Sequence, residues 1–180
     1  MGYTHYWWRT LELDTKLFRK AATDCRSICN ALPFLLGNGL GVGMPIFDER
    51  KICFNGSKYS QHFANSQPSV CWSFGEFSEL QFSDRQVSTD GDGSFETFAV
   101  PRCRDADDLE ENGQYFDFCK TGRRPYDLNV QACLIILNHH FGNDLFRVQS
   151  DGDNEEWNDA RQVCHAVLRF GLDFQLTNNN

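Results

Sequence analysis

The stretch YFDFCKTGRRPYDLNVQACLIILNHHFG, residues 115–142, predicts a short strand, a basic turn and a long helix. Phe116 and Phe118 alternate with residues of other kinds, which is the period of two expected of a strand. Pro125 disfavours helical geometry at the residue before it, so the strand and the helix are separated by a turn.

The helix in this stretch has clear start and stop signals. We expect Asp127 to be its N-cap and Gly142 to end it. The apolar run over residues 128–137 covers most of the helix circumference. A helix that is apolar on nearly all sides is typical of a protein core, so we predict that this one is deeply buried.

The turn between the strand and the helix carries three cations, Lys120, Arg123 and Arg124. The N-terminus of a helix has a partial positive charge and unpaired N–H groups, which attract anions. The turn is therefore the first candidate for an anion-binding pocket.

Size and composition indicate one globular domain. The chain has 180 residues, of which 41% are hydrophobic and 14% aromatic, and a formal net charge of −8. That charge disfavours general binding to nucleic acids or membrane surfaces, although a local basic patch remains compatible with it. We expect a single domain over residues 1–175 and a frayed tail over residues 176–180.

The rest of the chain alternates strand and helix patterns. Strands are predicted near residues 3–8, 51–55, 70–74, 77–83, 94–100, 115–119 and 145–148, and helices near 15–32, 128–142 and 154–170. Consecutive strands in the middle of the chain favour antiparallel pairing. The pattern predicts an α+β fold with a single mixed, largely antiparallel sheet and about three helices packed on it.

The eight cysteines are best interpreted as free thiols. The N-terminus lacks the basic and apolar regions of a signal peptide, and several cysteines stand where a small core residue is expected. Cys25 and Cys29 share a helix face, but no second cluster completes a zinc site. We therefore expect no metal, no cofactor and no membrane-spanning segment.

Two further patterns fail the tests for ligand-binding loops. Glycines alternate over residues 37–43 without the spacing of a dinucleotide fold or a P-loop, which favours a flexible connection. The acidic loops at residues 90–93 and 151–153 resemble the start of a calcium-binding loop. Neither has a glycine at the sixth position or a glutamate at the twelfth, where such a loop requires them.

Five short motifs stand out along the chain. They are MGYTHYW at residues 1–7, FNG at 54–56, ETF at 96–98, FCKTGRRPYD at 118–127 and SDG at 150–152. In this order and spacing the chain resembles a group of small uncharacterised proteins of bacteria and their phages, over nearly its whole length except the glycine-rich segment and residues 61–85. The resemblance implies a cytoplasmic protein of a bacterium or of a virus-infected host cell. It implies no established activity.

Polar residues near the predicted strand ends define the candidate site. The first hypothesis is an accessory protein that binds a small anionic, nucleotide-like ligand, with sequestration of a nucleotide signal as one role for it. The side chains expected to bind it, by charge or by stacking, are Lys120, Arg123, Arg124, Tyr126, Asn55 and Trp7.

Two alternatives stay open. The second hypothesis is a hydrolase of a phosphodiester or glycosidic bond, with Glu96, Asp127 and His5 as acid, base and proton-transfer groups. In the third, these residues are structural, with Glu96 and Lys120 paired between strands and Asp127 serving only as a cap. Oligomeric state is not predicted by the sequence.

Overall fold

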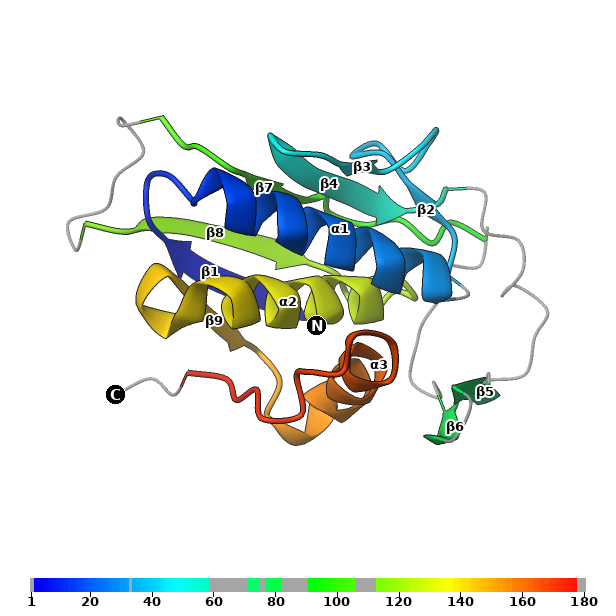
Figure 1. The fold of residues 1–180 in the computed structure, drawn as a ribbon. Helices are drawn as coiled ribbons and strands as arrows, with labels where there is room; N and C mark the ends of the chain where they lie inside the picture. Colours follow the sequence, from blue (N-terminus) through cyan, green and yellow to red (C-terminus); the bar gives the residue numbers. More distant parts are fainter. Residues whose placement is uncertain are drawn as a thin grey trace.

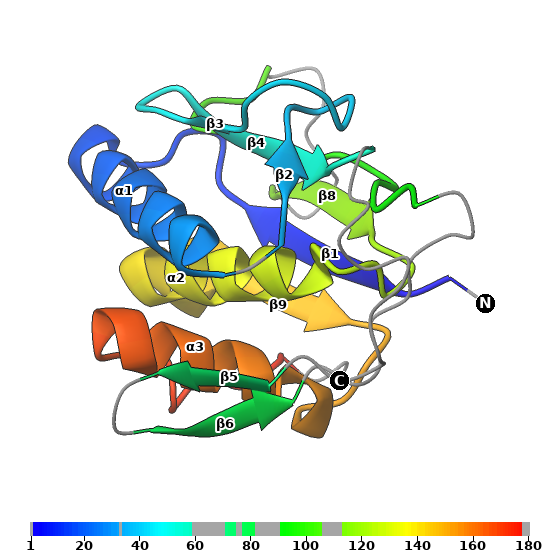
Figure 2. The same ribbon diagram turned by 90° about the vertical axis from the view of Figure 1, so that its right-hand side faces the viewer.

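The computed structural model of the protein describes residues 2–32, 34–58, 71–74, 77–81, 91–105 and 113–177. In chain order the elements are β1 (Thr4–Arg9), α1 (Thr15–Ala31), β2 (Leu36–Gly37), β3 (Ile46–Phe47), β4 (Lys51–Gly56), β5 (Cys71–Phe74), β6 (Phe77–Gln81), β7 (Phe98–Pro101), β8 (Tyr115–Lys120), α2 (Asp127–Leu145), β9 (Phe146–Ser150), the 3-10 helix η3 (Glu155–Trp157) and α3 (Asn158–Leu168). The three α-helices lie on one side of the sheets that contain β1 and β4 (Figures 1 and 2).

β1 is the middle strand of a three-stranded antiparallel sheet in the order β8-β1-β9. Its His5 stands opposite Cys119 of β8 and Ser150 of β9. Because both outer strands are antiparallel to β1, they run parallel to each other, and α2 connects them. The strand–helix–strand unit predicted near residues 115–148 is therefore present, with β1 inserted between its two strands.

β4 is the middle of a second antiparallel sheet, in which it pairs with β2, β3 and β7, while β5 and β6 pair with each other. The predicted α+β class, with three helices packed on largely antiparallel strands, is confirmed. The strands form two main sheets rather than a single mixed one, and each described pair is antiparallel. The physical reason is that β7 forms its ladder with β4, while the segment before it meets β8 through a hydrogen bond from Glu96 N to Lys120 O (3.3 Å).

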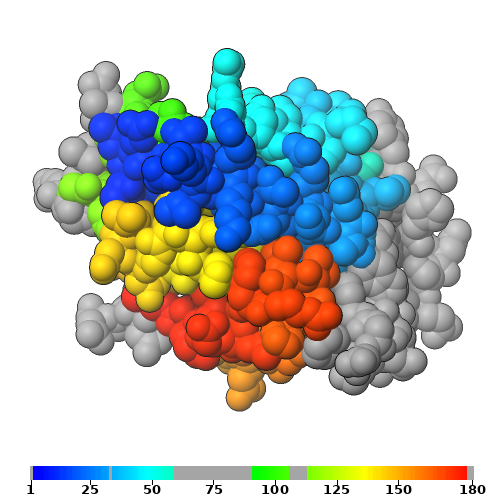
Figure 3. Space-filling model, viewed as in Figure 1, coloured from blue at the N-terminus to red at the C-terminus, as the bar shows by residue number. Residues whose placement is uncertain are grey.

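α2 is the centre of the core. All residues from Asp127 to Leu137 are buried, as the apolar run predicted. α2 packs against α1 and α3 as well as against β1 and β9. In the space-filling view, α1 and α3 form the outer surface on either side of the C-terminal half of α2 (Figure 3).

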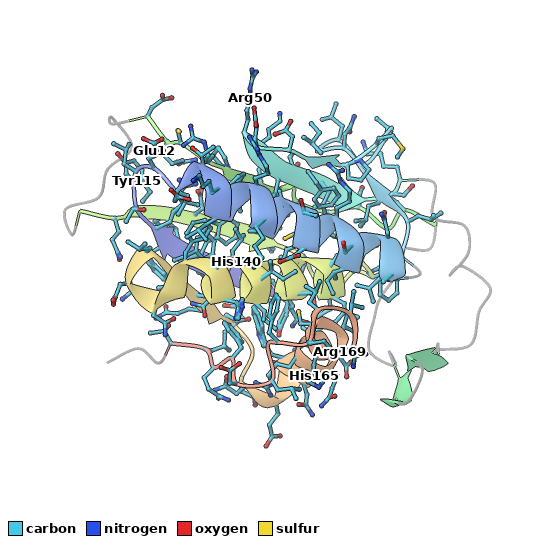
Figure 4. The ribbon with its side chains drawn as sticks, in the orientation of Figure 1. Glu12, Arg50, Tyr115, His140, His165 and Arg169 are labelled. Carbon is cyan, nitrogen blue, oxygen red and sulfur yellow. The ribbon has the colours of Figure 1, made fainter. Side chains whose placement is uncertain are left out.

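α1 lies within the helix predicted near residues 15–32, and its buried side chains recur every three or four residues along one face. Asp14 caps it, because its carboxylate accepts hydrogen bonds from the backbone N–H groups of Lys16 and Leu17, each 2.9 Å long. A polar contact also holds α1 to α2: His140 lies between the two helices (Figure 4), with its Nε2 2.7 Å from Asp24 Oδ2.

Both predicted ends of α2 need correction. Tyr126, not Asp127, is the N-cap residue, and no side chain caps this end. Asp127 lies inside the first turn because its carboxylate is bound by side chains from β1 and the preceding turn. At the other end Gly142 has a non-helical backbone (φ 73°), as a stop signal requires, but hydrogen-bonded turns continue to Leu145.

Residues 176 and 177, which the sequence placed in a frayed tail, are held by hydrogen bonds. Leu176 N donates a hydrogen bond to Asn154 Oδ1 (2.8 Å) and Thr177 N donates one to Val148 O (3.0 Å). These two bonds hold residues 176 and 177 against β9 and the segment that follows it, while residues 178–180 lie outside the described part of the chain.

The cysteines and the helices agree with two further expectations. Each cysteine whose side chain is described is free, and most of them are buried, namely Cys25, Cys29, Cys119, Cys133 and Cys164. Within the described ranges, no helix has both the length and the apolar character that crossing a membrane would require.

Candidate functional site

The best-defined polar group in the core joins His5 to Asp127. β1 turns the His5 ring toward the N-terminus of α2, where Nε2 lies 2.7 Å from Asp127 Oδ1. The Thr121 hydroxyl also donates a hydrogen bond to this carboxylate. His5, Asp127 and Thr121 are all buried. The structure therefore brings together two of the candidate residues, His5 of β1 and Asp127 of α2, which lie far apart in the sequence.

Ser150 completes a chain of hydrogen bonds through His5. Its Oγ lies 2.9 Å from His5 Nδ1, and the N–H of Gly152 donates to the same oxygen (3.2 Å). A carboxylate is an acceptor only, so the His5 nitrogen facing Asp127 carries a hydrogen. In neutral histidine the other nitrogen then accepts, and the Ser150 hydroxyl donates to it. Sequence reasoning missed Ser150, because its position opposite His5 depends on the register of β9 against β1.

Arg123 is occupied by a different pair. Its guanidinium forms an ion pair with Glu156 and lies over the Tyr3 ring, 4.0 Å from the ring centroid. The Tyr3 hydroxyl in turn donates to Glu156 (3.4 Å). Burial raises the pKa of Tyr3, and the nearby charge of Asp127 raises it further. Arg123 thus holds η3 against the N-terminal segment, and its charge is balanced by a carboxylate.

Glu96 is anchored by backbone groups. Its carboxylate accepts a hydrogen bond from the backbone N–H of Lys120 (2.8 Å), and its carbonyl accepts one from the Tyr126 hydroxyl (2.7 Å). Glu96 therefore contacts the strand that carries Lys120, whereas Asp127 contacts His5 and Thr121, and His5 contacts Ser150. Tyr126 is fully buried, and that burial raises its pKa.

Asn55 fixes the neighbouring residue, Phe95. Its amide donates to the carbonyl of Phe95 (2.9 Å) and its carbonyl oxygen accepts from the Phe95 N–H (3.0 Å). Asn55 is 3% exposed, so it holds the backbone of Phe95 from the buried side. Trp7 was another residue predicted to bind the ligand. It lies in the core at 1% exposure, and its ring centroid is 5.4 Å from that of Phe98.

Phe95 itself is exposed, and two cations lie near its ring. Its side chain is 44% exposed. Lys120 Nζ and Arg124 Cζ each lie 5.9 Å from the ring centroid. Arg124 is oriented by a hydrogen bond from Nη1 to the carbonyl of Asp92 (2.9 Å). We call Phe95, Lys120 and Arg124 the Phe95 surface; Phe95 had no distinguishing signal in the sequence.

The sheet face that points away from α2 continues this aromatic character. Side chains alternate between the two faces of a strand, so Phe116 and Phe118 share the Lys120 side of β8. On β1, Tyr6 stands opposite Phe118 and Trp8 opposite Phe116. The Phe116 and Phe118 rings are 6.1 Å apart, and Phe118 is 53% exposed.

A polar hollow of about 470 Å³ opens beside Ser150. It is lined by Tyr6, Gln149, Ser150, Asp151, Gly152, Asp153, Asn154, Leu176 and Thr177. Among the residues that the structure describes, the lining contains two carboxylates and no lysine or arginine. Within the described residues no group of three histidine, cysteine or acidic side chains could hold a metal ion.

Comparison of the chain with protein-family models, with curated proteins and with solved structures finds no match. The resemblance to small bacterial and phage proteins therefore stays a prediction. The arguments about function below rest on the geometry of the site.

Proposed function

We propose that the protein binds a small anionic, nucleotide-like ligand on the Phe95 surface. The observation that carries this proposal is the exposed Phe95 ring with two cations near it, Lys120 Nζ and Arg124 Cζ, each 5.9 Å from its centroid. A nucleotide has a flat base that stacks on aromatic rings and a phosphate that binds cations. The Phe95 surface offers both kinds of contact within one nucleotide's reach.

The stacking partner is held in place before any ligand arrives. Asn55 binds the backbone of Phe95 through both its donor and its acceptor. The Tyr126 hydroxyl and the Lys120 N–H bind the next residue, Glu96. A prearranged aromatic ring loses little conformational freedom on binding, so more of the stacking free energy is retained in the affinity.

The two cations are suited to phosphate in different ways. Arg124 uses Nη1 for Asp92 O, and a guanidinium has five N–H donors in all. Lys120 supplies a compact charge, and the Glu96 carboxylate near it binds its backbone N–H. Arg123 is less suited, since Glu156 balances its charge.

The overall charge limits the size of the ligand. A net charge of −8 repels a long polyanion, whereas a mononucleotide or a short oligonucleotide contacts the local cations alone. Phe118, on the same strand face as Lys120, provides a second exposed ring beside the Phe95 surface. The proposal therefore concerns a small molecule and not general nucleic-acid binding.

The test is calorimetric titration of the full chain with nucleoside mono-, di- and triphosphates, with nucleosides, and with inorganic phosphate. Phe95→Ala removes the stacking ring and is expected to weaken nucleotide binding roughly 10-fold or more, because one stacked base contributes about 1–3 kcal/mol. Lys120→Gln and Arg124→Gln are expected to weaken nucleotides while leaving nucleosides nearly unaffected.

The matched control is Arg19→Gln, which removes an exposed arginine that pairs with Glu49 on another face. It should leave the affinity unchanged. The proposal fails if no nucleotide binds to the wild-type chain, or if Arg19→Gln weakens binding as much as Lys120→Gln does.

A further inference from the structure

A second site lies where the chain of hydrogen bonds from the core reaches the surface. Asp127 contacts His5 Nε2 at 2.7 Å, and His5 Nδ1 contacts Ser150 Oγ at 2.9 Å. Ser150 also lines the polar hollow. We propose that Ser150 is a nucleophile, with His5 as its general base and Asp127 as the positioning residue, in the cleavage of an ester by acyl transfer.

The direction of the hydrogen bonds matches that role. Asp127 accepts from Nε2–H, which leaves the lone pair of Nδ1 facing the Ser150 hydroxyl. A serine hydroxyl is a weak nucleophile until a base takes its proton, and a histidine oriented by a carboxylate provides that base. The ring nitrogens exchange the places they have in the familiar serine hydrolases, but each contact has the same chemical role.

The surroundings of His5 hold its ring in one orientation. The rings of Tyr3 and Trp157 meet it edge-on, each with centroids 5.1 Å from the His5 centroid. The ring is fully buried, and the residue that contacts its Nδ1, Ser150, is one of those that line the hollow. Rigid placement of the base and nucleophile is what raises the rate of an intramolecular proton transfer.

The charge of the hollow indicates the class of substrate. Asp151 and Asp153 line it, and none of the described residues that line it is cationic. This environment repels phosphodiesters and carboxylates, and it favours neutral or positively charged acyl esters. The site therefore differs in ligand chemistry from the Phe95 surface and does not depend on the nucleotide proposal.

The proposed ester cleavage proceeds through an acyl-serine. Ser150 Oγ attacks the ester carbonyl carbon while its proton moves to His5 Nδ1. The tetrahedral intermediate then breaks its bond to the alkoxy oxygen, which takes the proton from Nδ1 and leaves as an alcohol. Water cleaves the acyl-serine by the same sequence, releasing a carboxylic acid and restoring Ser150. Asp127 keeps its hydrogen bond to Nε2–H throughout and stabilises the imidazolium.

The experiment treats the folded full chain with p-nitrophenyl acetate and, separately, with a fluorophosphonate ester. Release of p-nitrophenol is followed by absorbance, and the modified residue is identified by mass spectrometry of peptides. The wild-type chain should release p-nitrophenol and carry a single adduct on Ser150. Ser150→Ala should abolish the adduct and reduce ester cleavage to the level of buffer.

Two further variants separate chemistry from folding. Asp127→Asn keeps an oxygen acceptor but removes the charge. It is expected to slow the labelling of Ser150 on the order of 10²–10⁴-fold. Circular dichroism establishes that the variant is folded. The control is Ser27→Ala, which replaces an exposed serine on α1. It should change neither the labelling nor the rate of ester cleavage.

The outcome is decisive in both directions. Absence of an adduct in the folded wild-type chain, an adduct on another residue, or an unchanged cleavage rate in Ser150→Ala would each overturn the proposal. Nucleotide binding by Ser150→Ala is measured in parallel and should equal that of the wild type, so failure at one site is distinguishable from failure at the other.

Discussion

Replacing Asp127 with alanine should strongly destabilise the protein. The wild-type carboxylate accepts hydrogen bonds from His5 Nε2–H and from the Thr121 hydroxyl, and all three residues are buried. In the alanine variant both donors lose this acceptor, and the Thr121 hydroxyl keeps only a longer contact to the carbonyl of Tyr3 (3.4 Å). A buried donor without a partner costs about 1–3 kcal/mol, so the expected loss in the free energy of unfolding is at most about 2–6 kcal/mol.

Asp127→Asn tests the cause of that loss. An asparagine oxygen can still accept, but without a negative charge each hydrogen bond is roughly half as strong. The expected loss is about 1–3 kcal/mol, intermediate between wild type and Asp127→Ala. The order of the three proteins is therefore a sharper test than either value by itself.

Urea unfolding followed by tryptophan fluorescence measures the effect. With a slope of about 2 kcal/mol per molar urea, Asp127→Ala should lower the midpoint by about 1–3 M. Asp144→Ala is the control, because Asp144 is an exposed acid on the same helix. It should change stability by less than about 0.5 kcal/mol. If Asp127→Ala is as stable as Asp144→Ala, the buried hydrogen bonds do not stabilise the fold as argued.

The remaining predictions concern alkaline pH and close packing. Burial raises the pKa of Tyr3 and of Tyr126 above the ordinary value near 10, so the stabilisation from keeping them neutral is complete below about pH 10 and is lost as the pH rises further. Tyrosinate absorbance of these two residues should appear together with unfolding, and their titration near pH 10 in the folded chain would refute this. Gly56→Ala places a Cβ 2.0 Å from Gly93 O and should lower the melting temperature in calorimetry by roughly 2–4 °C for each 1 kcal/mol of overpacking; an unchanged melting temperature would contradict the packing.

The parts of the fold that the sequence predicts are those with strong local signals. The burial of α2 follows from an apolar circumference, and the cap of α1 follows from Asp14. Division of the strands into two sheets depends on which distant segments pair. No local sequence pattern indicates that β7 forms its ladder with β4, or that the segment before β7 contacts β8 at Glu96.

The candidate site divides in the same way. Lys120, Arg124 and Asp127 are predictable because charged residues near a helix start are conspicuous in any sequence, and His5 because it is a titratable residue in a predicted strand. Ser150 and Phe95 are ordinary residue types. Ser150 joins the site through the register of β9, and Phe95 joins through the hold of Asn55 on its backbone.

The burial of Asp127 also explains why the two proposed sites are separate. An unoccupied helix N-terminus attracts an external anion, but here the carboxylate of Asp127 already lies in the first turn of α2. Its negative charge is compensated there by the helix and by hydrogen bonds from His5 and Thr121. A phosphate placed at the same end would meet like charge. In our two proposals the anion therefore binds farther out, at Lys120 and Arg124, while the inward-facing carboxylate acts through His5 on Ser150.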